Sequence, residues 1–271
     1  MQFARLNGAV LHYQEIAGPE GAPVIVFVNS LGTDFRIWRD VIVRLVGEYA
    51  VLTYDKRGHG LSDIGEAPYD MALHVDDLAA LLDHLGQKRV IVCGVSVGGM
   101  IAQGLAASRP DLVSALVLCD TAHKIGTPEM WDERVAAIRA DGSLASIVDM
   151  VMERWFTPGF REPGNAAYDG YRNMFLRQPL DGYVGTCQAI GAADFTRSSA
   201  ALDLPVICVV GDQDGSTPPD LVLSLARLIA DAHYEVIAGA GHLPCIEQPE
   251  VLSDIIKTFI GKIGLEGMAH G

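Results

Sequence analysis

The sequence predicts an α/β fold in which helices cover both faces of a mostly parallel central sheet, with an inserted helical cap. Three observations support this prediction. Short apolar segments without charges recur along the chain, as expected for strands that are buried on both faces. Segments with helical periodicity alternate with them, which is typical of βαβ units. The alternation stops over residues 122–196, where no buried strand is evident.

The chain begins with a predicted hairpin and continues into alternating strands and helices. Residues 3–6 and 9–15 alternate between apolar and polar around Asn7-Gly8, a dipeptide typical of a two-residue hairpin turn. The elements expected next are strands at residues 24–28 and 50–54 and helices at 37–46 and 71–85, with polar loops at 29–34 and 55–62.

A second series of strands and helices lies on both sides of the cap. Strands are expected at residues 90–95, 115–119, 206–210 and 234–237, and helices at 99–108, 221–229 and 251–259. Residues 122–196 contain helix-like stretches broken by Pro/Gly turns. We therefore expect the core to comprise residues 1–121 and 197–271, with the cap at 122–196 between them.

The composition is that of a globular protein with an acidic surface. Of 271 residues, 49% are hydrophobic and 20% charged, which is enough for a packed core and argues against disorder. The formal net charge is −14, and no basic cluster is present, so neither a nucleic acid nor an anionic membrane is the expected partner. An anionic ligand would need locally placed positive charge.

Cysteine usage and the N-terminal segment indicate a soluble, cytoplasmic protein. The five cysteines include no C-x-x-C pair, which favours a reducing compartment over a disulfide or zinc framework. The first residues lack the basic and apolar regions of a signal peptide, and no apolar run reaches membrane-spanning length. The oligomeric state is left open.

The residues Gly94-Val-Ser-Val-Gly98 fit the pattern G-x-S-x-G, between a predicted strand and a predicted helix. A serine in a sharp turn between strand and helix needs small neighbours, which explains the two glycines. Such a turn presents the Ser96 hydroxyl beside a helix N-terminus, whose amides can stabilise negative charge. An ordinary serine in a Gly-rich turn would also fit the pentapeptide alone, but the flanking elements favour a nucleophile.

An acid and a base are expected in loops that follow later strands. His242 lies in the Gly-rich loop after the last strand and is the preferred base. Asp214 is the preferred acid because it lies further into its loop than Asp212, which we interpret as a turn residue, whereas Asp120 follows an earlier strand and is the second choice. Most of the remaining histidines are interpreted as surface polar residues; they are His12, His59, His74, His84, His123, His233 and His270.

Stabilising an oxyanion requires two directed hydrogen-bond donors. The amide of Val97 at the helix N-terminus is one candidate. The loop after the first parallel strand should supply the other, and we choose the amide of Leu31 within Asn29-Ser-Leu-Gly32.

Over nearly its whole length the sequence resembles the α/β-hydrolases, and more specifically the 3-oxoadipate enol-lactonases. The residues that match most specifically are Asn29-Ser-Leu-Gly-Thr-Asp34 and Leu116-Val-Leu-Cys-Asp-Thr-Ala-His-Lys-Ile-Gly-Thr-Pro-Glu-Met-Trp131. Tyr54-Asp-Lys-Arg-Gly-His-Gly60 and Arg154-Trp-Phe-Thr-Pro158 add to the resemblance. It departs at Asn29-Ser30, where many hydrolases carry His-Gly.

The resemblance implies a serine hydrolase that opens an anionic lactone in the degradation of aromatic compounds, with neither a cofactor nor a metal. The substrate would carry a free carboxylate. Trp131 and Arg134 are three residues apart and would share a helix face, so we expect Arg134 to pair with the carboxylate and Trp131 to line the pocket. Arg154 and Trp155 are the second choice. A surface ion pair and cap–core packing would also account for these residue types.

Two kinds of alternative share these features. A carboxylesterase, a perhydrolase or a carbon–carbon-bond hydrolase would use the same three residues. A small-molecule receptor on a hydrolase scaffold could also keep them while turning over slowly.

Overall fold

The computed structural model describes residues 1–264 and confirms the predicted α/β architecture. One sheet of eight strands has the order β1-β2-β4-β3-β5-β6-β7-β8, with antiparallel pairing for β1–β2 and β2–β4 and parallel pairing elsewhere. The strands are β1 Gln2–Leu6, β2 Ala9–Ile16, β3 Val24–Val28, β4 Ala50–Tyr54, β5 Val90–Val95, β6 Val113–Cys119, β7 Val206–Gly211 and β8 His233–Ile237.

The hairpin and the buried strands follow directly from the residue pattern. Asn7 (φ 47°) and Gly8 (φ 75°) adopt the positive φ angles that a tight hairpin turn requires. Every residue of β3, β5, β6 and β7 is buried, as their unbroken apolar sequences predict. The edge strand β8 is mostly exposed and carries His233 and Glu235, whose polar side chains discourage pairing with another edge.

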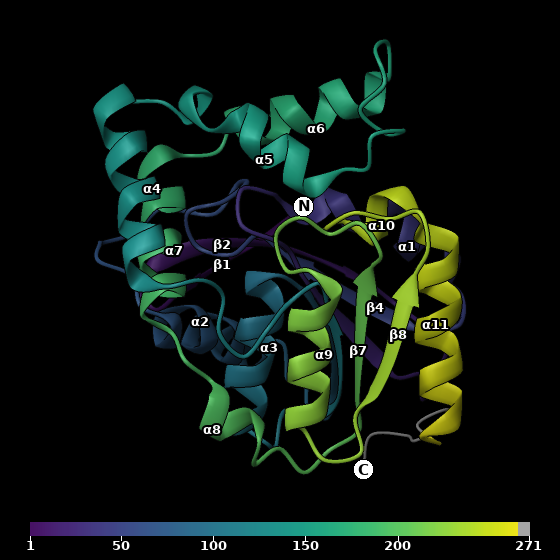
Figure 1. Cartoon of the computed structure of the whole chain (residues 1–271). Helices are drawn as coiled ribbons and strands as arrows, with labels where there is room; N and C mark the ends of the chain where they lie inside the picture. Colours follow the sequence, from purple (N-terminus) through teal and green to yellow (C-terminus); the bar gives the residue numbers. More distant parts are fainter. Residues whose placement is uncertain (265–271) are drawn as a thin grey trace.

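Helices cover both faces of the sheet (Figure 1). On one side α1 packs against α11, and on the other α2, α3, α8 and α9 form a contiguous row. Their bounds are α1 Arg39–Leu45, α2 Met71–His84, α3 Val97–Ser108, α8 Thr196–Ser199, α9 Pro219–Leu228 and α11 Pro249–Lys262; two short elements, η1 Phe35–Trp38 and α10 Pro244–Glu247, lie beside α1 and α11.

The helices from α4 to α7, between β6 and β7, lie beyond the carboxyl ends of the strands (Figure 1). They are α4 Pro128–Asp141, α5 Val148–Trp155, α6 Ala166–Leu176 and α7 Leu180–Ala192, with η2 Leu144–Ser146 between α4 and α5. Local signals define α4: the Thr127 side chain caps its first turn, Pro128 starts it, and Gly142 ends it at φ 70°. The domain boundaries at 122 and 196 remain a prediction.

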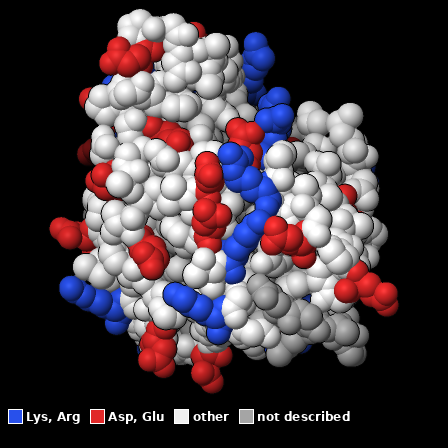
Figure 2. Space-filling view, turned by 90° about the vertical axis from the view of Figure 1, so that its right-hand side faces the viewer, with Lys and Arg blue, Asp and Glu red and all other residues white. Residues whose placement is uncertain are grey.

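Charged side chains of both signs share the side of the molecule that carries α1 and α11 (Figure 2). A narrow row of basic side chains is flanked by acidic ones on this face. Ion pairs such as Lys257–Glu48, at 2.6 Å, link such groups. Within residues 1–264, no helix is long and apolar enough to cross a membrane.

The interpretation of most other histidines as surface residues is wrong for three of them. His12, His59 and His74 are 4%, 0% and 1% exposed. Each has a polar contact inside the protein: His12 Nδ1 donates to Asp55, His59 Nε2 accepts from the Gly32 amide, and His74 Nε2 lies 3.3 Å from the Thr186 hydroxyl. Long-range partners therefore permit their burial. His84 and His233 are exposed, His123 is partly buried, and His270 lies outside the described residues.

Candidate active site

Ser96 occupies a strained turn between β5 and α3. Its backbone has φ 59° and ψ −122°, a combination that L-residues rarely adopt and that costs about 1–3 kcal/mol. The Ser96 amide donates to the Cys119 carbonyl at 3.0 Å, and the Thr121 hydroxyl donates to the Ser96 carbonyl at 2.6 Å. These contacts with the end of β6 hold the turn in place.

The two glycines of the G-x-S-x-G pattern are required by close backbone contacts. A Cβ atom on Gly94 would lie 2.3 Å from the Gly98 carbonyl oxygen, and one on Gly98 would lie 2.1 Å from the Val28 carbonyl oxygen. Both distances are far below van der Waals contact. The motif therefore reflects chain crossings as well as the conformation of Ser96.

Asp214 and His242 meet across two loops, as the sequence predicts. The Nδ1 atom of His242 lies 3.0 and 2.9 Å from the two carboxylate oxygens of Asp214, and both side chains are buried. Because an ionised carboxylate only accepts hydrogen bonds, Nδ1 carries the proton and Nε2 can act as a base. Ser96 and His242 line the same cavity.

The hydrogen bonds around Asp214 favour its ionised form. Burial alone would raise the pKa of Asp214, but the charge of His242 and hydrogen bonds from His242, Thr217 and Ser216 outweigh it, so the pKa lies below its ordinary value. Thr217 donates through its hydroxyl at 2.6 Å and its amide at 3.0 Å. Sequence reasoning missed Thr217, because an aspartate in a loop indicates a turn but does not reveal which neighbouring hydroxyl bonds to it.

The two other acids considered from the sequence have different surroundings. Asp212 accepts hydrogen bonds from the amides of Gly239 and Ala240 at 2.8 and 3.2 Å, so it supports the loop that carries His242. Asp120 is fully buried, and its Oδ1 accepts from the Gly211 amide at 2.9 Å. Burial and the nearby charge of Asp214 raise the pKa of Asp120 well above its ordinary value. Burial beside Asp214 therefore favours the protonated form of Asp120.

Asp120, Asp214 and His242 each offer a possible metal-ligating atom, and these atoms lie within 4.8 Å of one another. Their chemistry does not favour a cation. The oxygens of Asp214 already accept hydrogen bonds from Ser216, Thr217 and His242, and burial disfavours the ionised form of Asp120 that would bind a cation best. The cluster is better described as an Asp–His pair with a second buried carboxyl group beside it.

The two amides expected to stabilise an oxyanion are available. Among the described residues, neither the Leu31 nor the Val97 amide has a hydrogen-bond partner. Leu31 lines the same cavity as Ser96, and Val97 begins α3 immediately after it. Unpaired amides at this position are suited to receive the negative charge that develops when a serine attacks a carbonyl.

A small cavity of about 60 Å³ joins these groups to the helical segment above the sheet. Two arginines and no aspartate or glutamate line it, although the chain has a net charge of −14. The lining residues are Ser30, Leu31, Ser96, Ile125, Met130, Trp131, Arg134, Val151, Arg154, Trp155, Tyr183, Ile190, Ser216, Thr217 and His242. The site is therefore small, partly apolar and locally positive.

All four residues proposed for substrate binding line the cavity. The guanidinium of Arg134 lies over the Trp131 ring, 4.8 Å from its centroid, which confirms that they share a face of α4. Among the described residues, neither Arg134 nor Arg154 forms an ion pair. Arg134 is partly buried and Arg154 exposed, so Arg134 would interact more strongly with a carboxylate.

The carboxyl end of α5 supports the loops that carry Asp214 and His242. The Trp155 carbonyl accepts from the His242 amide at 2.8 Å, and the Arg154 carbonyl accepts from the Gly215 amide at 3.2 Å. Glu247 links the same region to the histidine loop by accepting from the Thr157 hydroxyl at 2.6 Å and the Gly241 amide at 2.8 Å. The sequence gives no signal for these contacts, because they join residues far apart in the chain.

Replacing Glu247 with alanine should loosen this link. Removing the acceptor leaves partly buried donors on Thr157 and Gly241 unpaired, at a cost of about 1–3 kcal/mol. We expect a lower melting temperature and, because His242 is less firmly held, a kcat reduced by about 10-fold. Thermal unfolding and steady-state kinetics would measure both, with Glu153→Ala, at an exposed position on α5, as the control. Unchanged kcat in a destabilised Glu247 variant would contradict the positioning role.

Comparison with known proteins agrees with this geometry. A family model described as the alpha/beta hydrolase fold matches residues 23–165. The chain is 34% identical to 3-oxoadipate enol-lactonase 1 of Acinetobacter baylyi over 92% of each chain, and 32% identical to enol-lactonase 2 of the same organism over 89% of this chain and 90% of that protein.

A solved structure of an enol-lactonase is also similar to this chain. The enol-lactonase from Burkholderia xenovorans superposes with a TM-score of 0.91 at 34% identity, over 96% of this chain and 100% of that one. The family match, the parallel sheet and the arrangement of Ser96, Asp214 and His242 are mutually consistent. The chain is a hydrolase of the α/β-hydrolase family.

Proposed function

We propose that this hydrolase opens 3-oxoadipate enol-lactone to 3-oxoadipate, a step in the degradation of protocatechuate and related aromatic compounds by the β-ketoadipate pathway. The single observation that carries the proposal is the locally positive cavity beside Ser96 and His242 in a strongly acidic chain. It suits a small substrate with a reactive carbonyl and a carboxylate. The similarity to enol-lactonases supports the choice of this lactone as the substrate.

In the proposed mechanism His242, oriented by Asp214, removes the Ser96 proton as the Ser96 oxygen attacks the lactone carbonyl. The amides of Leu31 and Val97 hold the oxyanion of the tetrahedral intermediate. Its collapse breaks the ring carbon–oxygen bond, and the enol oxygen takes the proton from His242. The enol tautomerises to a ketone, which disfavours ring closure. Water activated by His242 then hydrolyses the acyl-enzyme and releases 3-oxoadipate.

The direct test is steady-state turnover of the enol-lactone, with identification of 3-oxoadipate as product. We expect kcat/KM for the lactone to exceed that for p-nitrophenyl acetate. Repeated turnover of the ester without turnover of the lactone would point to a carboxylesterase. A single stalled acylation would point to a receptor.

Replacing Arg134 with methionine should impair lactone binding selectively. A hydrogen-bonded ion pair with the substrate carboxylate contributes about 1.5–3 kcal/mol, so we expect KM for the lactone to rise by about 10- to 100-fold. KM for p-nitrophenyl acetate, which has no carboxylate, should change little. Arg154→Met is the matched comparison and should have the smaller effect, because Arg154 is exposed. Equal changes for both substrates in the Arg134 variant would contradict the assignment.

A further inference from the structure

The loop that supplies the Leu31 amide is fixed by a buried lysine. Lys56 follows β4, is 1% exposed, and donates from Nζ to the Ser30 carbonyl oxygen at 2.6 Å. The same oxygen accepts from the Thr33 hydroxyl at 2.9 Å. The Ser30 carbonyl and the Leu31 amide belong to one peptide unit, so contacts with the carbonyl act directly on the proposed oxyanion donor.

The geometry of this peptide unit directs the Leu31 amide. The peptide is trans, because the cis peptide found in the structure is Ala67-Pro68. A trans peptide points its C=O and N–H groups in opposite directions. With the carbonyl held towards Lys56, the Leu31 N–H must point away from the lysine. It has no partner among the described residues, and Leu31 lines the cavity beside Ser96.

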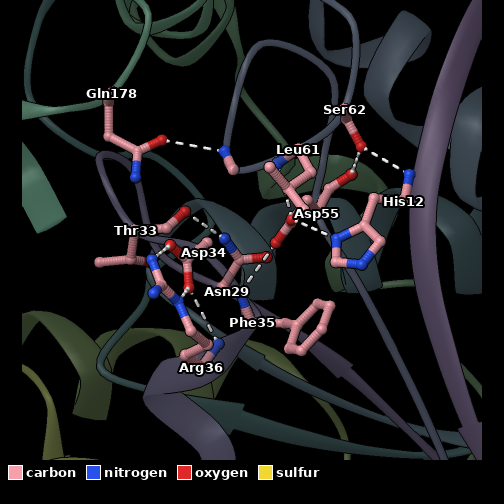
Figure 3. A network of polar contacts seen from close by, with 11 residues as sticks. His12, Asn29, Thr33, Asp34, Phe35, Arg36, Asp55, Leu61, Ser62 and Gln178 are labelled. Carbon is pink, nitrogen blue, oxygen red and sulfur yellow. Dashed lines mark hydrogen bonds and ion pairs between the residues drawn. The ribbon is translucent and has the colours of Figure 1, made fainter. Parts of the chain in front are cut away.

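Neighbouring contacts hold the rest of the loop (Figure 3). The Asn29 side chain donates to the Thr33 carbonyl at 2.5 Å, and the Asp34 carboxylate accepts from Arg36 at 2.6 and 2.8 Å. Asp55 accepts from the Phe35 amide at 2.9 Å and so ties the loop's end to the end of β4. None of these contacts involves the Ser30–Leu31 peptide. That peptide is held by the hydrogen bonds from Lys56 and Thr33 to the Ser30 carbonyl.

Burying an ammonium group at this position to make one hydrogen bond costs desolvation free energy. Burial lowers the pKa of Lys56 to about 7, although the charges of Asp55 and Asp34 oppose this shift. Among the described residues, no carboxylate lies within ion-pair distance of Nζ. An apolar side chain of similar length would fill the space without this desolvation.

We propose that Lys56 is a positioning residue for the oxyanion hole: its ammonium group holds and polarises the Ser30–Leu31 peptide so that the Leu31 amide donates more strongly to the tetrahedral intermediate. A cation at the carbonyl oxygen draws electron density through the peptide and makes its N–H a better donor. The effect appears where negative charge develops, so it favours the transition state over the bound substrate. This inference rests on the proposed serine mechanism but not on the identity of the lactone.

The test is Lys56→Met, which keeps the length and removes the charge. We expect kcat for p-nitrophenyl acetate to fall by about 10- to 100-fold, less than complete loss of an oxyanion donor, with KM nearly unchanged. Affinity for an arylboronic acid, which forms a tetrahedral adduct with the serine, should fall in proportion to kcat/KM. Lys88→Met, at an exposed lysine, is the control and should match the wild type.

Stability should change in the opposite direction to activity. In the native state Lys56 binds its proton less tightly than in the unfolded state, so its burial destabilises the fold most below pH 7 and progressively less as pH rises towards 10.5. Lys56→Met should therefore raise the melting temperature most at low pH. The charged or titratable groups nearest Lys56, which are Asp34, Asp55, His59 and His74, are retained in both proteins.

Wild-type kcat and boronate affinity in Lys56→Met would overturn the proposal. A lower melting temperature together with a higher KM and a lower kcat would overturn it as well. If that variant does not fold, Lys56→Gln carries the test, and a fall in kcat with unchanged KM supports the proposal. Failure of the wild type to turn over any ester would instead refute the serine mechanism. Turnover of the ester without the lactone would refute only the substrate assignment.

Discussion

Replacing Ser96 with alanine is expected to lower kcat for both the lactone and p-nitrophenyl acetate by at least about four orders of magnitude. Without its hydroxyl no acyl-enzyme forms, and only the oxyanion amides and substrate binding remain to assist attack by water. Combining Ser96→Ala with His242→Ala should add little further loss, because the two groups act in the same step. Steady-state rates and trapping of the acyl-enzyme by mass spectrometry would measure these effects.

A second serine on α3 offers a matched control for this substitution. Ser108 lies at the carboxyl end of α3, far from Ser96, and its hydroxyl donates to the Gly104 carbonyl. The kcat of Ser108→Ala should therefore equal that of the wild type. Ordinary lactone turnover in Ser96→Ala would show that another group is the nucleophile, or that water attacks directly. Either outcome would end the proposed mechanism.

Asparagine substitutions should distinguish the two buried aspartates. Asp214→Asn removes the charge that orients His242 and stabilises its protonated form, so we expect kcat to fall by about 10,000-fold. Asp120→Asn replaces a carboxyl group whose protonated form is favoured by burial with a neutral group of similar shape, and its oxygen can still accept from the Gly211 amide. We therefore expect kcat to change by less than about 10-fold in this variant.

Kinetics and thermal unfolding of the two variants would decide between the acids. A larger loss of activity in Asp120→Asn than in Asp214→Asn would identify Asp120 as the group that acts through His242. Melting temperatures within a few degrees of the wild type in both variants would show that the difference reflects catalysis rather than folding.

Several features of this protein could be predicted from local sequence alone. The unbroken apolar segments fix the buried strands, because a parallel sheet covered on both faces has no exposed side. Gly94 and Gly98 mark the turn of Ser96 because that turn needs neighbours without side chains. The loops of Asp214 and His242 could be placed together because the carboxyl ends of parallel strands share one edge of the sheet.

The same reasoning failed where burial depends on distant partners. His59 appeared to be a surface residue, yet it accepts a hydrogen bond from Gly32, and the buried environment of Asp120 depends on Asp214 and Gly211. Burial of a titratable group is set by whether the fold brings a partner to it, and a single sequence does not display such pairings.

The sequence by itself determined the order of the three candidate catalytic residues along the chain. Ser96, Asp214 and His242 each follow a recognisable strand. Only the tertiary structure decided that both arginines face the cavity, that the end of α5 supports the loops of Asp214 and His242, and that Lys56 reaches the Ser30 carbonyl. The physical reason is the distance along the chain over which each kind of interaction acts. Turn and strand preferences act over a few neighbouring residues, whereas contacts of this kind join residues from 26 to 90 positions apart.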